Sequence, residues 1–283
     1  MRTLSRLASG VLFAAIVLLL LMRPPASAEG PVDVDLELVM AVDISMSMDP
    51  DEQKLQREGY LEAFRDPTLV TAIRGGGRHR RIAVTYVEWA GPGTAVTVIP
   101  WQVIDSQARA AAFVAELARQ PYNRRSRTSI ASALQYAQAQ FGAGGFRGNR
   151  RVIDVSGDGV NNSGPLMSVV RPQVLATGTI INGLPILIKP TTTWTAWDAP
   201  DLDLYYATCV IGGPGSFSIP ILKREDFVNA TRQKILLEIA KLAPETSPAP
   251  RVIRTQATPG KPGKPAEYDC SLVEYRLQRQ QGQ

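Results

Sequence analysis

Three oxygen-bearing side chains recur at every second position near the start of this sequence. Asp43, Ser45 and Ser47 follow 34-VDLELVMAV-42, an apolar segment that predicts a buried strand. Alternating positions cannot all face one side of a helix, but they can line one side of a loop that leaves a strand. Carboxylate and hydroxyl oxygens suit Mg²⁺, Mn²⁺ or Ca²⁺ better than zinc or copper. The stretch therefore indicates a site for a divalent cation, with Mg²⁺ the first choice.

Three oxygen atoms do not complete an octahedron, and two later segments offer further donors. Thr128 lies in 124-RRSRTSIASAL-134, where a helix is expected to start, and Asp158 lies in 154-DVSGDGVNN-162, just after a predicted strand. The carboxyl ends of parallel strands meet at one edge of a sheet, so Asp43 and Asp158 are expected on the same rim.

Two other interpretations of the alternating stretch explain less of the sequence. A turn and capping cluster would suit Asp and Ser, but it leaves Thr128 and Asp158 unexplained. An EF-hand is excluded, because Met48 and Lys54 stand where that loop needs Gly and Glu.

The elements that must position these residues alternate along the chain. Strands are expected at 34–42, 82–90, 94–101, 151–156, 179–187 and 216–222. Helices are expected at 49–64, 106–119, 129–141, from about 166, and at 225–243. This order predicts an α/β fold, a doubly wound and mostly parallel sheet flanked by helices, and the hairpin-like pair at 82–101 adds one antiparallel edge strand.

Both ends of the chain differ in composition from the middle. Residues 1–28 carry arginines, a short apolar run and an Ala26-Ser27-Ala28 cleavage pattern, which indicates a signal peptide in place of a membrane anchor and an exported, periplasmic or secreted protein. Cleavage removes three arginines and no acidic residue, so the formal charge falls from +5 to +2. Residues 244–283 form a Pro/Gly-rich tail that we expect to be extended.

Only two cysteines occur, Cys209 and Cys270. In an oxidising compartment an even pair favours a disulfide, whereas the alternative is two free thiols.

Together, the oxygen-donor segments resemble those of a von Willebrand factor A domain with a metal-ion-dependent adhesion site. The resemblance covers residues 34–243 and departs from the usual pattern at Ser156 and Gly157. More narrowly, 181-INGLPI-186, 204-LYYATCVIGGPGSF-217 and the last predicted helix of that region resemble a bacterial family of exported, uncharacterised proteins.

The wider resemblance implies that the hydroxyls of Ser45, Ser47 and Thr128 coordinate the cation directly, and that Asp43 and Asp158 bind it directly or through water. It also implies that a carboxylate of a protein partner, from Asp or Glu, fills the remaining position. Two carboxylates nearly neutralise a divalent ion but leave it able to attract another anion.

Other functions have less support. Basic clusters occur at 78–81, 124–127 and 147–151, and such clusters are typical of solvated surface. The second cluster could also form a rim that attracts an acidic partner. No aromatic residues interleave the clusters, as nucleic-acid binding would require. The sole histidine, His79, lacks a Cys or Asp partner at motif spacing. The sequence thus predicts a protein-binding module and not an enzyme, with a metal-assisted hydrolase or a structural subunit of an envelope complex as alternatives.

Overall fold

The computed structural model describes residues 30–188, 201–240, 251–252 and 268–281. By its contacts the chain divides into a first unit, Met1–Pro31, and a second unit, Val32–Gln283, which holds all the elements below. The predicted signal peptide therefore lies outside the described residues. No helix in the described ranges is long and apolar enough to cross a membrane.

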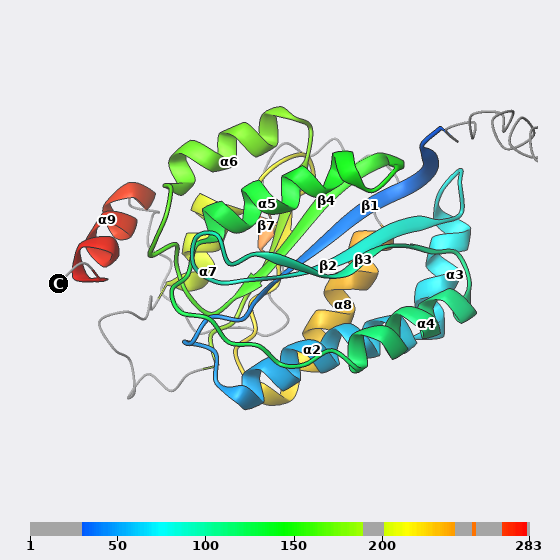
Figure 1. The fold of residues 1–283 in the computed structure, drawn as a ribbon, viewed down its shortest axis with the longest axis horizontal. Coiled ribbons are helices and arrows are strands. Elements are labelled where there is room, and N and C mark those ends of the chain that lie inside the picture. The colour runs from blue at the N-terminus through cyan, green and yellow to red at the C-terminus, as the bar shows by residue number, and fades with distance from the viewer. Residues whose placement is uncertain (1–29, 189–200, 241–250, 253–267, 282–283) are drawn as a thin grey trace, which may run out of the picture. The chain divides into compact units, whose positions relative to one another are not determined.

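A seven-stranded sheet with the order β3-β2-β1-β4-β5-β6-β7 forms the centre of the second unit (Figure 1). All neighbouring strands are parallel except β2 and β3, which pair antiparallel at one edge, as the sequence predicted. The strands are β1 (Val32–Asp43), β2 (Ile82–Trp89), β3 (Val96–Ile104), β4 (Phe146–Gly157), β5 (Ile180–Pro185), β6 (Phe217–Ser218) and β7 (Arg251–Val252).

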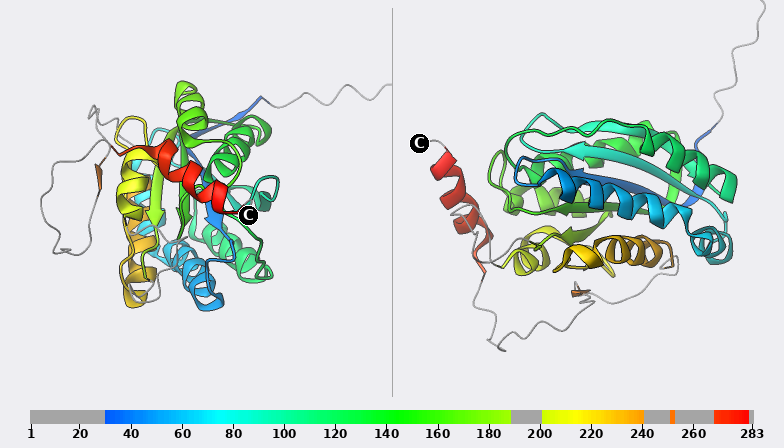
Figure 2. Two further views of the ribbon diagram at one scale, coloured as in Figure 1. Left: turned by 90° about the vertical axis from the view of Figure 1, so that its left-hand side faces the viewer. Right: turned by 90° about the horizontal axis from the view of Figure 1, so that it is seen from below.

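Helices cover both faces of this sheet (Figures 1 and 2). They are α2 (Pro50–Arg65), α3 (Pro67–Gly76), α4 (Gln107–Ala118), α5 (Ile130–Ala143), α6 (Met167–Ala176), α7 (Leu202–Tyr205), α8 (Phe227–Ala240) and α9 (Cys270–Gln281), with a π-helical turn at Tyr206–Val210 and a 3₁₀ turn at Arg224–Asp226. The predicted start of α2 is correct, because Asp49 and Glu52 form a reciprocal capping box with each other's backbone N–H groups.

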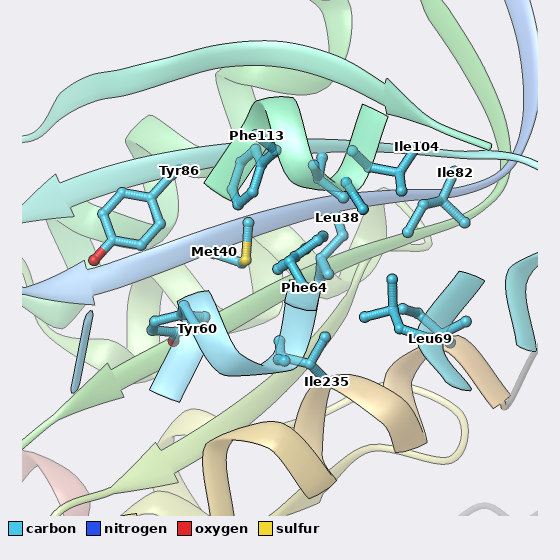
Figure 3. Packing of buried hydrophobic residues seen from close by; sticks show 14 of the residues in the cluster. Leu38, Met40, Tyr60, Phe64, Leu69, Ile82, Tyr86, Ile104, Phe113 and Ile235 are labelled. Atoms are coloured by element: carbon cyan, nitrogen blue, oxygen red, sulfur yellow. The ribbon is translucent and has the colours of Figure 1, made fainter. Parts of the chain in front are cut away.

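Side chains of β1 alternate between two hydrophobic cores. Leu38 and Met40 pack with residues of α2, α3, α4 and α8, such as Phe64 (Figure 3). Val39 and Ala41 pack on the other face, with residues of α5 and α6. A strand that is buried on both faces explains why its sequence is almost continuously apolar.

The C-terminal part departs from the sequence prediction. The tail expected to be extended contains α9. The disulfide that the even cysteine pair favoured is present and joins Cys209 to Cys270. Asp269 caps the helix by accepting a hydrogen bond from Leu272 N, and Leu277 is buried in the second core. The sequence prediction missed this helix because the proline- and glycine-rich residues before it made the whole tail look unsuited to regular structure. The connecting residues 241–250 and 253–267 lie outside the described residues.

Candidate metal centre

The strand order reverses direction between β1 and β4, and the candidate residues lie at the carboxyl ends of these two strands. Successive strands run outward from β1 to β2 and β3 on one side, and from β4 to β7 on the other. Val42 pairs with Ser156, so Asp43 and Gly157 end their strands at the same level. Ligands of open α/β sheets bind at such a switch point.

The loop after β1 arranges its three donors through local hydrogen bonds. Asp43 is fully buried, and its Oδ1 accepts a hydrogen bond from Ser45 N at 2.6 Å. Ser45 is buried, Ser47 is exposed, and their Oγ atoms lie 2.7 Å apart. The donors therefore run from the sheet interior outward to solvent.

Two further loops bring the distant residues to the same place. Ser47 Oγ donates a hydrogen bond to Asp158 Oδ1 at 2.6 Å across 111 residues of sequence. Thr128, in the connection between α4 and α5, bonds through its backbone to Asn162, and a Cβ built at Gly159 would lie 3.6 Å from its Oγ1. The structure thus brings all five predicted residues to one rim, although ligation of a metal by them stays a prediction.

The sequence departs from the usual pattern at Ser156 and Gly157, and the structure explains why a serine and a glycine occupy these positions. Ser156 Oγ is buried and accepts hydrogen bonds from Gln56 Nε2 at 2.7 Å and from Tyr60 OH at 3.3 Å. A Cβ at Gly157 would lie 2.7 Å from Asp43 Oδ2, closer than real side chains approach. Glycine at this position therefore leaves room for the Asp43 carboxylate.

Two residues that hold the rim in place, Arg124 and Tyr206, were not predicted in that role. Arg124 Nη2 donates hydrogen bonds to the carbonyl oxygens of Met46 and Met48, both at 2.8 Å, and so fixes the loop of the two serines. Tyr206 is fully buried, and its hydroxyl lies 3.1 Å from the Cβ position at Gly157. Both contacts join segments far apart in the chain, which periodicity and motif spacing cannot reveal.

Helix α9 also holds the loop that carries Asp158. The buried Glu274 accepts hydrogen bonds from Asn161 Nδ2 at 3.0 Å, from Tyr205 OH at 2.8 Å and from Met167 N at 3.0 Å. Asn161 Oδ1 in turn accepts one from Ala131 N, in the first turn of α5. The tail thus supports two of the three loops of the rim.

Electrostatics at the rim disfavour negative charge on Asp43. Burial and the neighbouring Asp158 raise the pKa of Asp43 well above its ordinary value. Burial also raises the pKa of the Tyr206 hydroxyl, and the charges of Asp43 and Asp158 add to this effect. A nearby cation would reverse the penalty on the carboxylates.

The residues present fit a hard divalent cation. Asp43 Oδ2 and the Tyr206 hydroxyl are buried without a hydrogen-bond partner in the described part of the chain. No lysine or arginine of the described residues forms an ion pair with Asp43. Over the same ranges no three His, Cys, Asp or Glu side chains gather as a metal site, so this rim relies on hydroxyl oxygens beside its two carboxylates.

Solved structures with the same fold place the chain in a class. A pilus adhesin, SpaC from Lactobacillus rhamnosus GG, aligns with a TM-score of 0.54 at 14% identity, over 76% of this chain and 31% of its own. Proximal thread matrix protein 1 from the mussel byssus, with a zinc-occupied metal-ion-dependent adhesion site, aligns with a TM-score of 0.50 at 14% identity, over 75% and 48%. A von Willebrand factor type A protein from Catenulispora acidiphila gives 0.50 at 17%, over 74% and 43%. The fold is that of a von Willebrand factor A domain.

The chain belongs to the family described as Protein of unknown function (DUF1194), which matches residues 33–243. No curated protein has a significant sequence match. The chain aligns with less than half the length of each of the three solved structures.

Proposed function

We propose that this protein is an exported protein-binding module that holds one divalent cation at the rim and captures a carboxylate of a protein partner. Asp43, Ser45, Ser47, Thr128 and Asp158 would hold the cation, which supplies positive charge for the partner's Asp or Glu. The observation that carries the proposal is Asp43, a fully buried carboxylate with an unpartnered oxygen among oxygen donors only. A buried carboxylate without a counter-charge is costly, and a bound cation removes that cost.

The choice of ion follows from the donors. Carboxylate and hydroxyl oxygens favour Mg²⁺, and Mn²⁺ or Ca²⁺ suit the same set. The zinc in the mussel protein supports a divalent ion at this place in the fold, but without sulfur or nitrogen donors we propose Mg²⁺ here.

Calorimetric titration with Mg²⁺ and Mn²⁺ tests the site. We expect binding by the wild type and none by Asp43→Ala, because that substitution removes half of the site's negative charge. Asp51→Ala is the matched control, since Asp51 is exposed on α2 and outside the rim. Equal heats for wild type and Asp43→Ala, or none for wild type even with acetate present, would overturn the proposal.

Retention of an envelope protein in Mg²⁺ but not in EDTA would support the partner half of the proposal. Metal-dependent turnover of ester or phosphate substrates would support a hydrolase in its place. His79 does not support a hydrolase at the rim, because it comes before β2, at the amino ends of the strands, where its backbone N–H donates a hydrogen bond to Asp35 Oδ1. If substitutions of the rim residues had no effect in the cell, a structural subunit would be favoured.

We also propose export with removal of residues 1–28 and a domain organisation of one A domain at 34–243 followed by the tail 244–283. No stable membrane anchor and no nucleic-acid partner are part of this proposal. Mass spectrometry of the protein from its native cell should show a chain that starts near Glu29. Intact residues 1–28 on cytoplasmic protein would contradict it.

A further inference from the structure

The connection between α4 and α5 presents a block of exposed positive charge beside the rim. Residues 119–129 contain four arginines and no acidic residue, and the last part leads directly into Thr128. Arg124, Arg125 and Arg127 are exposed, and within the described residues none of the three forms an ion pair with a carboxylate. Some exposed arginines elsewhere do have such partners, for example Arg65 with Glu58 at 2.6 Å, whereas Arg74 and Arg80 have none within the described residues.

The backbone of this connection is fixed against the rim. Arg125 N donates a hydrogen bond to Ile44 O at 3.0 Å, and Arg125 forms a parallel β-bridge with Ser45. Arg127 adopts a left-handed φ of 70°, and a Cβ at Gly91 would lie 2.8 Å from Ser126 O. The backbone that carries the arginines is therefore held in one conformation, which lowers the backbone part of the ordering cost of binding.

The segments that carry the site also contain two exposed apolar side chains. Met46, between the two serines, is 59% exposed, and Tyr122 is 50% exposed. The Arg57 guanidinium lies 4.0 Å from the centre of the Tyr122 ring, and Arg57 also donates hydrogen bonds to the carbonyl oxygens of Gln120 and Pro121. Tyr122 is thus an ordered aromatic surface, of the kind enriched in protein interfaces.

From these contacts we propose that the rim selects an acidic protein segment, with further Asp or Glu residues around the carboxylate that meets the cation, and an apolar residue that packs on Met46 and Tyr122. Arg125 and Arg127 bind the additional carboxylates. This inference rests on the proposed function, because it assigns partner chemistry to the same site.

Charge is the reason for choosing an acidic protein segment as the occupant. Three arginines that form no ion pair with a carboxylate of the described residues lie beside the proposed cation site, and they repel cationic partners and attract anionic ones. A nucleic acid would meet the same charges, but Tyr122 is the only aromatic residue among residues 119–129, too few for base stacking along a strand. The combination of a fixed aromatic ring, Met46 and guanidinium groups suits a peptide.

Selection from a displayed random peptide library in Mn²⁺, with EDTA as the parallel condition, tests the proposal. Three proteins are compared: wild type, Arg125→Gln/Arg127→Gln, and the control Arg74→Gln/Arg80→Gln, which removes the same charge from exposed positions before β2. The best selected peptide is then titrated by fluorescence anisotropy, together with a version in which only the flanking Asp and Glu become Asn and Gln. Heparin is titrated as an unrelated polyanion.

We expect wild type and control to enrich peptides with several acidic residues. The Arg125→Gln/Arg127→Gln protein should bind the acidic peptide roughly 3- to 10-fold more weakly and the neutral-flanked peptide unchanged, as for exposed ion pairs. EDTA-sensitive selection without an acidic preference would overturn the inference and leave the proposed function standing. Enrichment that EDTA does not reduce would overturn the proposed function itself. Heparin binding as tight as the acidic peptide, in EDTA, would show an unselective anion surface and overturn the inference.

Discussion

Asp154, inside β4, and Asp43, at the end of β1, are both buried carboxylates, but within the described residues only Asp154 pairs with a basic side chain. Asp154, inside β4, contacts Lys234 of α8, whose Nζ also lies 3.2 Å from Glu238. All three side chains are fully buried. At the carboxyl end of the same strand Asp158 approaches Asp43, and no basic side chain of the described residues pairs with Asp43.

The contrast distinguishes a structural charge cluster from a site that needs an external ion. Burying carboxylates is tolerated where a cation and hydrogen bonds compensate them, as at Glu238, which also accepts two hydrogen bonds from Asn182 Nδ2 at 2.7 Å. Asp154 Oδ2 and Asp43 Oδ2 are both buried without a hydrogen-bond partner in the described part of the chain. The difference is that the interior cluster contains its own cation, Lys234, whereas no basic side chain of the described residues pairs with Asp43. Burial raises the pKa of the Tyr206 hydroxyl, and the charges of Asp43, Asp158 and Asp154 raise it further, so Tyr206 is influenced by both sites.

Removing the internal cation should have the largest effect. Lys234→Met removes the cation that contacts Asp154 and leaves Glu238 with Asn182 and the more distant Arg150, whose Nη2 lies 3.9 Å from Glu238 Oε2. We expect the free energy of unfolding to fall by about 3–5 kcal/mol, because Asp154 becomes a buried charge without a counter-charge. Chemical denaturation in EDTA measures it. The matched control is Arg232→Met, which breaks an exposed contact with Asp66 and should cost at most about 1 kcal/mol. Equal losses in the two variants would show that the buried lysine compensates nothing.

The pH dependence of the interior cluster should come next in size. Burial raises the pKa of Asp154 from 3.8 to about 6, despite the attraction of Lys234. A carboxyl whose folded pKa exceeds its unfolded value contributes stability at low pH that is lost as pH rises through the folded pKa. Relative to Asp154→Asn, the wild type in EDTA should lose up to about 3 kcal/mol of unfolding free energy between about pH 4 and 6. A difference that grows with pH would show that Lys234 outweighs burial.

At the rim, losing a carboxylate should change stability in the opposite direction. In EDTA, Asp43→Asn relieves the burial of an uncompensated charge while its amide oxygen can still accept from Ser45 N, and we expect stabilisation of about 1–3 kcal/mol. With excess Mn²⁺ the order should reverse, because only the wild type gains from ion binding. Thermal unfolding in both conditions measures this. A loss of stability in EDTA would mean that Asp43 is already compensated and would erase the contrast with Asp154.

The smallest effect is expected at Thr128. Thr128→Ala removes one neutral oxygen that water can replace, so Mn²⁺ affinity should fall roughly 3- to 10-fold, the range of one neutral hydrogen bond. Thr128→Ser keeps the hydroxyl and serves as the control, with near wild-type affinity. Stability in EDTA should hardly change, because Thr128 meets Asn162 through its backbone. Identical affinities for all three proteins would remove Thr128 from the ligand set.

Local pattern was enough to predict six of the seven strands of the sheet, without β7, and the convergence of the rim. The apolar run before Asp43 and the polar residues after β4 each mark a strand end, and parallel strands bring such ends together. The pairing of Lys234 with Asp154 across 80 residues was not predictable in this way, because a lysine within a helical segment is ordinarily a solvated residue. Helix α3 was missed as well, since its short apolar stretch follows α2 with only Asp66 between them, and β6 is shorter than its apolar segment suggested.

Because a disulfide joins Cys209 to Cys270, the attachment of α9 to the domain depends on the redox conditions around the protein as well as on its sequence. Reducing this disulfide with a thiol does not alter any of the five candidate ligands. It leaves α9, and with it the hydrogen bond between Asn161 Nδ2 and Glu274, held only by noncovalent contacts. In an oxidising compartment the bond closes a loop of about 60 residues and limits how far α9 can move away. Reduction and reoxidation can therefore weaken and restore, without any substitution, the support that α9 gives to the loop that carries Asp158.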